Sequence, residues 1–263
     1  MKQMSSAERV YIHGVGVDKL TSAQAYVRLC AMLSASPDQP QAIFTPNAEM
    51  LYRAANDDAQ FASILNTAAL NTADGVGTVW ASRILGTPLP ERIAGIELGE
   101  TALELAAAKR LPVFLLGSKR GVAYRAAANL RQRYRGLNIV GTHHGYFDVK
   151  GKQNQAVIDA IRAAAPKLLI VCLGSPRQER WIIQNSHLLN GVSVAMALGG
   201  SLDVWAGDVR RAPAAVRAVG MEWLWRILLS PSRLARAKAL PAFVIMTIKK
   251  SRQRASDPDK SPQ

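Results

Sequence analysis

The sequence predicts an α/β fold with a mainly parallel sheet and helices on both of its faces. Short apolar runs alternate along the chain with longer segments of helical periodicity. This is the pattern of buried parallel strands joined by crossover helices. In addition, 49% of the 263 residues are hydrophobic, which is enough for one sizeable core. We therefore expect one main unit, Rossmann-like in architecture, over residues 1–205.

The expected elements follow from these runs in chain order. Apolar runs predict strands at residues 10–12, 42–45, 69–72, 113–116, 138–141, 168–173 and 192–198. Thr21 and Gln24 form a capping-box pattern that starts a helix over 25–33. Helical periodicity predicts the other main helices at 96–110, 122–135, 153–164 and 178–185.

The C-terminal region differs from this core. We expect a basic appendage over 206–250 and a disordered polar tail over 251–263. The chain has 33 Lys and Arg against 19 Asp and Glu, a net charge of +14, and between Arg210 and Arg254 only Glu222 is acidic. Such local basicity predicts a polyanionic partner. From Met221, tryptophans and leucines mixed with cations are typical of an anionic membrane interface; the alternative is a helix packed on the core.

Cysteine usage and apolar run lengths bear on the compartment. Cys30 and Cys172 show no paired framework and no metal-ligand spacing, which favours a reducing cytosol. The N-terminus has no apolar signal region, and the late apolar run 239–248 is about half of the roughly 20 residues that a spanning helix needs. We expect neither a signal peptide nor a spanning helix.

Candidate functional residues follow the predicted strands, because ligands of open α/β sheets bind beyond the carboxyl ends of the strands. Thr45 and Asn47 follow the second strand, and Asn47 could also cap the next helix. Asp74 follows the third strand and precedes Gly75, so that it could act as a general base, although Asp-Gly is also a common turn pair.

Three later strand ends suggest anion binding. Gly117 and Ser118 form a strand-to-helix turn whose free N–H groups could receive phosphate. Gly174, Arg177 and Gln178 combine a glycine turn, a charge and an amide at a helix start; the amide could pair with a base or ribose. The glycines at 199–200, with Arg210 and Arg211, make a candidate wall facing a diphosphate, although a tight crossover with solvated arginines is the simpler alternative. No GxGxxG or P-loop occurs at any strand end.

Seven segments in this order resemble the WecG/TagA/CpsF family of glycosyltransferases: TPNAEM, ADGVG, RIAGIEL, HHGYF, LGSPRQE, GGSLDVWAGDVRRAP and EWLWRILLSPSRLAR. The resemblance runs from about Thr45 to Arg236. It implies an inverting enzyme of Rossmann-like fold that moves a UDP-activated sugar onto a polyprenyl-diphosphate-linked saccharide in surface or exopolysaccharide synthesis. The donor sugar stays open among N-acetylmannosamine, its uronic acid and glucose-type sugars.

The resemblance also implies roles for individual residues. Asp74 would be the catalytic base, with Thr45 and Asn47 beside it and the donor sugar. Arg92 would approach the diphosphate, and Gln178 with Glu179 would hold the nucleotide. Asp203 would bind ribose or orient a neighbour. If the acceptor is a lipid diphosphate, a further reading gives Arg226, Arg233 and Arg236 a part in closing the site, and puts the enzyme peripherally at the cytoplasmic face of the bacterial inner membrane. The oligomeric state stays open, with a homo-oligomer as one alternative.

We expect no metal and no other cofactor. The sole D-x-D pattern, at Asp257 and Asp259, lies in the predicted tail, and the four histidines form no ligand cluster. Arginines and helix N-termini would then stabilise the departing UDP.

Three other functions remain as alternatives. The charge alone suggests a nucleic-acid-binding protein, but no recognition helix or stacking platform accompanies it, and we expect no nucleic-acid partner. A nicotinamide-dependent oxidoreductase lacks its glycine fingerprint. The third is a non-catalytic scaffold for polysaccharide assembly.

Overall fold

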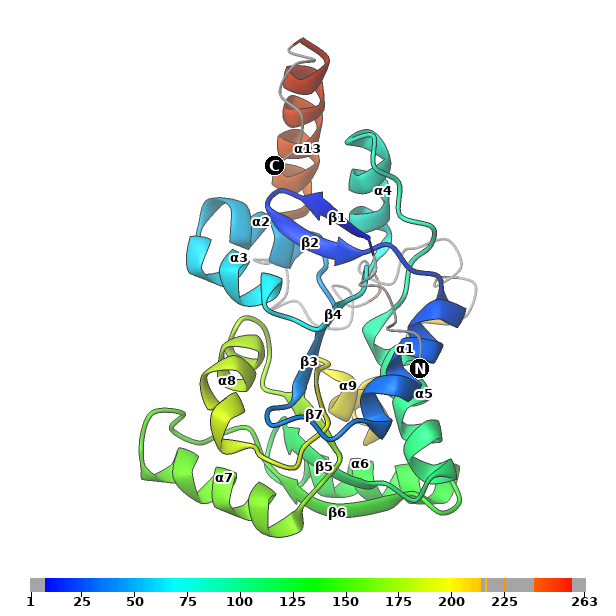
Figure 1. Ribbon diagram of the computed structural model, residues 1–263, viewed down its shortest axis with the longest axis vertical. Coiled ribbons are helices and arrows are strands. Elements are labelled where there is room, and N and C mark those ends of the chain that lie inside the picture. The colour runs from blue at the N-terminus through cyan, green and yellow to red at the C-terminus, as the bar shows by residue number, and fades with distance from the viewer. Residues whose placement is uncertain (1–7, 214–215, 217–224, 226–238, 257–263) are drawn as a thin grey trace.

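The structure is a computed structural model that describes residues 8–213, 216, 225 and 239–256. Its centre is a six-stranded sheet in the order β4-β3-β8-β7-β5-β6, and all neighbouring strands in it are parallel (Figure 1). The strands, in chain order, are β3 (Gln41–Phe44), β4 (Leu70–Asn71), β5 (Pro112–Gly117), β6 (Asn138–His143), β7 (Leu168–Cys172) and β8 (Val194–Ala197). The predicted α/β class is confirmed.

Helices cover both faces of this sheet, because each strand turns alternate side chains to opposite sides. In β3, Phe44 belongs to one hydrophobic cluster and Ile43 to the other. The first cluster includes residues of α2 (Ala48–Asn56), α3 (Ala59–Asn66), α4 (Val76–Ile84), α7 (Lys152–Ala164) and α8 (Arg177–Asn185), which a short 3-10 helix (Ser186–Leu188) follows. The second includes residues of α1 (Ser22–Ser34), α5 (Gly95–Ala108), α6 (Val122–Arg133) and α9 (Ser201–Trp205). All the predicted main helices are present, and the capping box of Thr21 and Gln24 at α1 is confirmed.

The first predicted strand does not join the parallel sheet. It forms β1 (Arg9–Ile12), which pairs antiparallel with β2 (Val15–Asp18) in a separate two-stranded sheet. The cause is the two-residue turn between them, where His13 has φ 50° and Gly14 has φ 85°. Turns with positive φ at both central residues match the twist of a hairpin. The expectation of a strand at 10–12 was correct, but its place in the parallel sheet was wrong.

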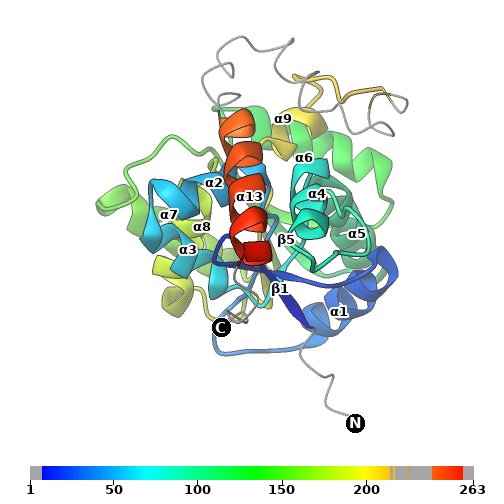
Figure 2. The same cartoon turned by 90° about the horizontal axis from the view of Figure 1, so that it is seen from above.

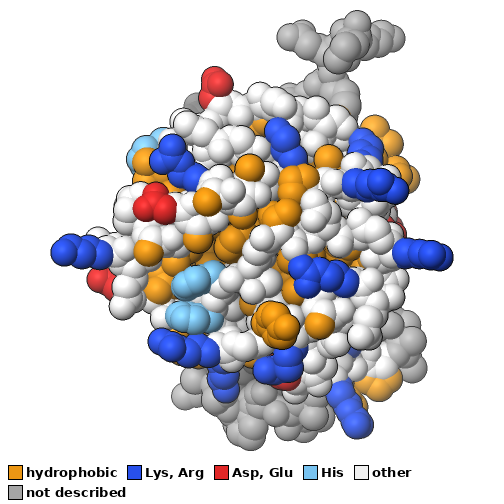
Figure 3. Space-filling model, turned by 90° about the horizontal axis from the view of Figure 1, so that it is seen from below, with side chains coloured by type: hydrophobic (Ala, Val, Ile, Leu, Met, Phe, Trp, Pro, Cys, Tyr) orange, Lys and Arg blue, Asp and Glu red, His pale blue; other side chains and the backbone are white. Residues whose placement is uncertain are grey.

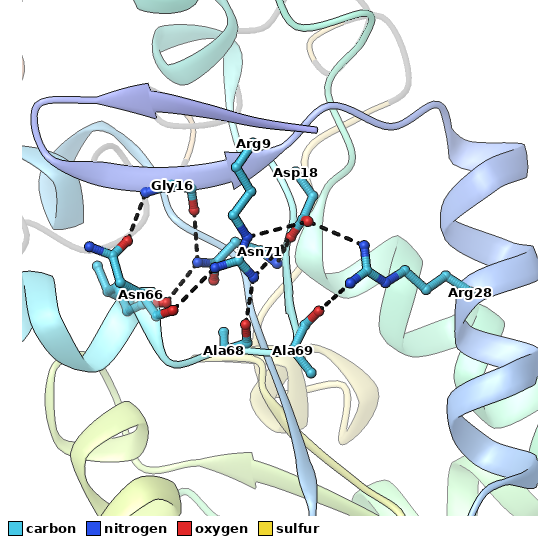
Figure 4. Close-up of polar contacts among 9 residues, drawn as sticks. Arg9, Gly16, Asp18, Arg28, Asn66, Ala68, Ala69 and Asn71 are labelled. Carbon is cyan, nitrogen blue, oxygen red and sulfur yellow. Dashed lines mark hydrogen bonds and ion pairs between the residues drawn. The ribbon is translucent and has the colours of Figure 1, made fainter. Parts of the chain in front are cut away.

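A buried carboxylate attaches this hairpin to the main sheet (Figure 4). Asp18 is 3% exposed and forms ion pairs with Arg9, at 3.4 Å, and Arg28, at 3.2 Å. Its other oxygen accepts a hydrogen bond from the backbone N–H of Asn71 at 2.7 Å. Because β4 is a two-residue edge strand, these bonds supply support that its own short ladder lacks. They fix the position from which the chain continues to Asp74.

The C-terminal helix α13 (Ala239–Ser256) lies between α2 and α4 (Figure 2). Phe243 and Thr247 on this helix are fully buried, and Thr247 Oγ1 is 2.9 Å from Nε2 of His13 in the hairpin turn. This part of the predicted appendage therefore packs on the core. The helix also continues to Ser256, so that residues 251–256 of the predicted disordered tail are helical. Among the described helices, none combines the length and apolarity that crossing a membrane requires.

Candidate active site

The predicted functional loops meet at one edge of the sheet. Parallel strands end on the same side, and the loops after β3, β4, β5, β7 and β8 all leave this carboxyl edge. They carry Thr45 and Asn47, Asp74, Gly117 and Ser118, Gly174 and Arg177, and the glycines that precede α9. The structure therefore brings together segments that are as much as 150 residues apart in the sequence, roughly the span from Thr45 to Gly199.

The loops after β3 and β4 are bound to each other through the main chain. The N–H of Asp74 donates to the carbonyl of Pro46 at 3.1 Å, and the hydroxyl of Thr78 donates to both the Pro46 and Asp74 carbonyls. These bonds use no side-chain atom of Asp74, which is half-buried. Its carboxylate thus lies at the carboxyl edge on a loop held by neighbouring groups, as a general base requires.

Thr45 and Asn47 flank the same loop. Asn47 Oδ1 accepts from the N–H of Met50 at 3.0 Å, which confirms it as the N-cap of α2. Thr45 is 8% exposed because α5 begins against it: a Cβ on Gly95 would lie 2.8 Å from Thr45 Oγ1. Both residues therefore have structural roles: Asn47 caps α2, and Thr45 packs against the start of α5. Their contacts with a donor sugar stay predictions.

Arg92 lies beside Asp74 along the backbone. The N–H of Ile93 donates to the carbonyl of Ala73 at 2.9 Å, so that Arg92 and Asp74, both predicted site residues, are each one position from this bond. The side chain of Arg92 is 3.8 Å from Glu97 in the first turn of α5, and Glu97 also accepts from Arg211 at 2.5 Å. Two arginines predicted to face a diphosphate therefore share one carboxylate.

Glu97 is a residue that the sequence prediction missed. It belongs to the RIAGIEL segment, where only Arg92 was given a role. The available signal was an acidic side chain in the first turn of a helix that starts at the carboxyl edge, next to a basic residue.

The turn after β5 differs from its prediction. Gly117 has φ 138°, and a Cβ there would lie 2.3 Å from the carbonyl oxygen of Cys172, so that only glycine fits. The N–H of Ser118 donates to that same carbonyl at 3.0 Å and is not free to receive phosphate, contrary to the prediction. The hydroxyl of Ser118 instead donates to Oδ1 of Asp203 at 2.5 Å. This bond joins the β5 loop to α9 and brings two predicted binding residues into contact.

The loop after β7 is supported by a buried amide. Gln178 is 3% exposed, and its Oε1 accepts from the N–H groups of Gly174, at 3.2 Å, and Gly199, at 3.0 Å. Its Nε2 donates to Glu179 at 2.8 Å. Gln178 therefore ties the loops after β7 and β8 together, and direct nucleotide contact by Gln178 and Glu179 stays a prediction.

Glu179 is an acid almost without solvent contact. It is 1% exposed, and its Oε2 has no hydrogen-bond partner, like the nearby buried hydroxyl of Ser175. Burial holds the pKa of Glu179 above its usual 4.5, although the hydrogen bond from Gln178 acts in the opposite direction. The carboxyl group therefore favours its neutral form more than an exposed glutamate does.

Arg177 is anchored to the HHGYF segment. Its guanidinium donates to the carbonyl of Phe147 at 2.6 Å and lies 5.5 Å from the centre of that ring. The rings of His143 and His144 are 4.5 Å apart, and burial, followed by the charges of His143 and Arg120, lowers the pKa of His144. In Figure 3, two histidine side chains lie together among hydrophobic and basic ones. In the described part of the chain, no three His, Cys, Asp or Glu are grouped to hold a metal ion.

The remaining predicted arginines lie toward the C-terminus. Arg210 is exposed, and its carbonyl accepts from the indole N–H of Trp225 at 3.4 Å. Arg211 is half-buried against Glu97. Arg226, Arg233 and Arg236 lie outside the described residues.

Comparison with known proteins agrees with this arrangement. The model of the glycosyl transferase WecG/TagA/CpsF family matches residues 10–257. A relative from Staphylococcus aureus (strain NCTC 8325 / PS 47) is 33% identical over 253 residues, which cover 96% of this chain and 97% of the relative. Relatives from strains COL and MRSA252 have the same identity and coverage. All three are named N-acetylglucosaminyldiphosphoundecaprenol N-acetyl-beta-D-mannosaminyltransferase.

Proposed function

This chain belongs to the WecG/TagA/CpsF family of glycosyltransferases, and on that premise we propose that it transfers a hexose from a UDP-sugar to a polyprenyl-diphosphate-linked saccharide, with inversion at the anomeric carbon. The observation that carries this proposal is the carboxyl edge, where a backbone hydrogen bond between Ile93 and Ala73 joins the chain next to Arg92 to the loop of Asp74. The name of the S. aureus relatives supports an acceptor of the lipid-diphosphate class.

In the proposed reaction, Asp74 is the general base. Its carboxylate takes the proton of an acceptor hydroxyl, whose oxygen forms a bond to the anomeric carbon of the donor. The bond from that carbon to the phosphate oxygen breaks, and its electron pair leaves with UDP. Attack from the face opposite the leaving group inverts the anomeric centre. The half-buried setting of Asp74 suits this role, because its backbone is held while its carboxylate lies at the edge of the sheet.

Arginines would stabilise the leaving group. Arg92 and Arg211 converge on Glu97 at the same edge, and guanidinium groups bind diphosphate through paired N–H donors. We propose that this replaces a divalent cation. The test is turnover in excess EDTA: undiminished transfer is expected, whereas a loss that Mg²⁺ or Mn²⁺ restores would overturn metal independence.

An acceptor held in a bilayer requires the enzyme at the membrane surface. On α13, Val244, Ile245 and Ile248 are exposed apolar residues, with Lys249 and Arg252 following in the next turn. Apolar side chains beside cations are the composition that binds an anionic interface. We propose that this face of α13 contributes to peripheral membrane binding.

A flotation experiment with anionic vesicles tests this binding. The double variant Ile245→Glu with Ile248→Glu should lose most of its vesicle-bound fraction, because it places two negative charges at the interface. The control is Val27→Glu on α1, where the side chain is 56% exposed, compared with 54% for Ile245 and 37% for Ile248. Equal flotation of the α13 variant and the control would contradict the proposal.

The decisive experiment for the activity is a donor panel. UDP-linked N-acetylmannosamine, its uronic acid and glucose-type sugars are each incubated with lipid-diphosphate-linked mono- and disaccharides, and the lipid products are separated. The name of the relatives makes N-acetylmannosamine with lipid-diphosphate-linked N-acetylglucosamine the first pair to test. Transfer with one donor supports the proposal, and the absence of transfer across the panel would refute it.

A further inference from the structure

Glu97 lies between two cations that come from different parts of the chain. Its Oε1 accepts from Arg211 Nη2 at 2.5 Å, and its Oε2 is 3.8 Å from Arg92 Nη2. Arg92 precedes α5, whereas Arg211 lies more than a hundred positions later, at the start of the basic C-terminal region. The carboxylate therefore joins the segment before α5 to the start of the basic C-terminal region.

Each member of this group has a supported backbone. Glu97 is in the first turn of α5, and α5 begins in contact with Thr45. Arg92 is next to Ile93, whose N–H donates to the loop that carries Asp74. Ahead of Arg211, the N–H groups of Asp208 and Val209 both donate to the carbonyl of Asp203. The three side chains thus extend from fixed positions toward one point.

Stability alone gives a weak reason for this arrangement. The side chain of Glu97 is 41% exposed, and ion pairs with that much solvent contact contribute little to folding. A carboxylate that contacts two arginines does orient them, because each guanidinium loses conformational freedom when it is bound to the same group. A guanidinium has five N–H donors, so that a bond to one carboxylate does not use its whole capacity.

We propose that Glu97 is a positioning residue that holds Arg92 and Arg211 as a single unit for binding the donor diphosphate. This inference rests on the proposed glycosyl transfer. Glu97 does not itself contact the reacting atoms in this role. It fixes Arg211 at the site and thereby attaches the start of the basic C-terminal region to the catalytic edge.

The proposal predicts a particular kinetic signature for Glu97→Gln. Loss of the carboxylate frees both arginines, so that they stabilise the departing diphosphate less well, and kcat should fall by roughly tenfold, less than the 10²–10³-fold that follows deletion of a stabilising donor. The donor KM should change by less than about threefold, because removing a negative charge favours an anionic ligand and offsets the lost order. Glu97→Asp, which keeps the charge, should recover part of kcat.

The matched control is Glu104→Gln. Glu104 is exposed on the same helix α5, so that the charge change and the helix are the same. Both variants should unfold at the same temperature as the wild-type chain. The coupling test is the double variant Glu97→Gln with Arg211→Ala: its loss of kcat should be smaller than the product of the two single losses, because the carboxylate acts in part through that arginine.

The results separate this inference from the proposed function. If the wild-type chain transfers no sugar from the donor panel, the proposed function fails. If the wild-type chain is active and Glu97→Gln matches Glu104→Gln in kcat and KM, the positioning role is wrong. The role is also wrong if the losses from Glu97→Gln and Arg211→Ala multiply, because independent effects multiply. A kcat-specific loss with partial rescue by Glu97→Asp, and a loss in the double variant that is smaller than the product of the single losses, supports it.

Discussion

The two sides of the carboxyl edge are supported in different ways. Over β3 and β4, backbone hydrogen bonds together with the hydroxyl of Thr78 hold the loops, and Asp74 and Arg92 are half-buried. Over β7 and β8, a side-chain amide holds the loops: Gln178 is 3% exposed, and its oxygen accepts from two glycine N–H groups. The loops of the first side are joined largely by main-chain bonds, whereas the loops of the second are joined through the side chain of Gln178.

This difference teaches which substitutions should affect chemistry and which should affect folding. Main-chain support survives a change of side chain, so that a substitution on the first side can remove activity and leave stability almost intact. Side-chain support does not survive, because a buried donor or acceptor without its partner is costly. Four substitutions test this contrast.

The largest expected effect is that of Asp74→Asn on transfer. An amide cannot take the acceptor proton, and kcat should fall by about 10²–10⁴-fold, the usual contribution of a general base. The bonds of the Asp74 backbone are kept, so that the unfolding temperature should stay the same. Asp159→Asn, on the exposed face of α7, is the control. Full activity of Asp74→Asn would show that the transfer does not depend on this carboxylate, and the role of Asp74 as general base would be wrong.

Gln178→Leu should have the largest effect on stability. It leaves the N–H groups of Gly174 and Gly199 without their acceptor and Glu179 without its donor. The free energy of unfolding should fall by about 2 kcal/mol or more, since each unsatisfied buried group costs about 1–3 kcal/mol. Denaturant unfolding measures this change, with exposed Gln155→Leu as the control. A loss no greater than that of the control would mean that the second side is supported by other contacts.

The sequence predicts which residues lie on each side of the carboxyl edge better than it predicts the contacts that their side chains make. The strand ends, and hence the loops of Asp74 and Gln178, follow from local pattern, because apolar runs and glycine turns mark them. Burial of Gln178 depends on Gly199, twenty-one positions later, and no local signal reports that contact. The prediction of a free N–H at Ser118 was wrong for the same reason, since its acceptor is the carbonyl of Cys172 on another strand.

The hairpin and α13 show the same limit. The strand at 10–12 was predicted, but its sheet was not, because the choice of partner depends on the turn at His13 and Gly14. Local composition made α13 a candidate for a membrane segment or a packed helix. Only its contacts with α2 and α4 reveal that one face is buried.

Asn47→Ala is expected to lower the stability less than Gln178→Leu does. It tests how much a side chain contributes to the stability of the first side. Asn47 caps α2, so that its loss should lower the free energy of unfolding by about 1 kcal/mol. Asn47→Asp is the matched variant, because aspartate caps a helix as well as asparagine does. If Asn47→Asp restores stability but not transfer, the amide has a role at the substrate; if it restores both, Asn47 is a cap alone.

The smallest of the four effects is expected for Glu179→Gln, and it takes the form of a pH dependence. Burial raises the pKa of Glu179 above 4.5 in the folded chain, so that in the pH range above 4.5 the folded state holds a proton that the unfolded state has released. The wild-type free energy of unfolding should therefore decrease as pH rises through that range. Glutamine cannot ionise and keeps an acceptor for Gln178, so that the variant should gain on the wild-type chain between pH 5 and pH 8, as measured by urea unfolding at both values. A constant difference between the two chains would show that Glu179 ionises alike in the folded and unfolded states, which would contradict the effect of burial on its pKa.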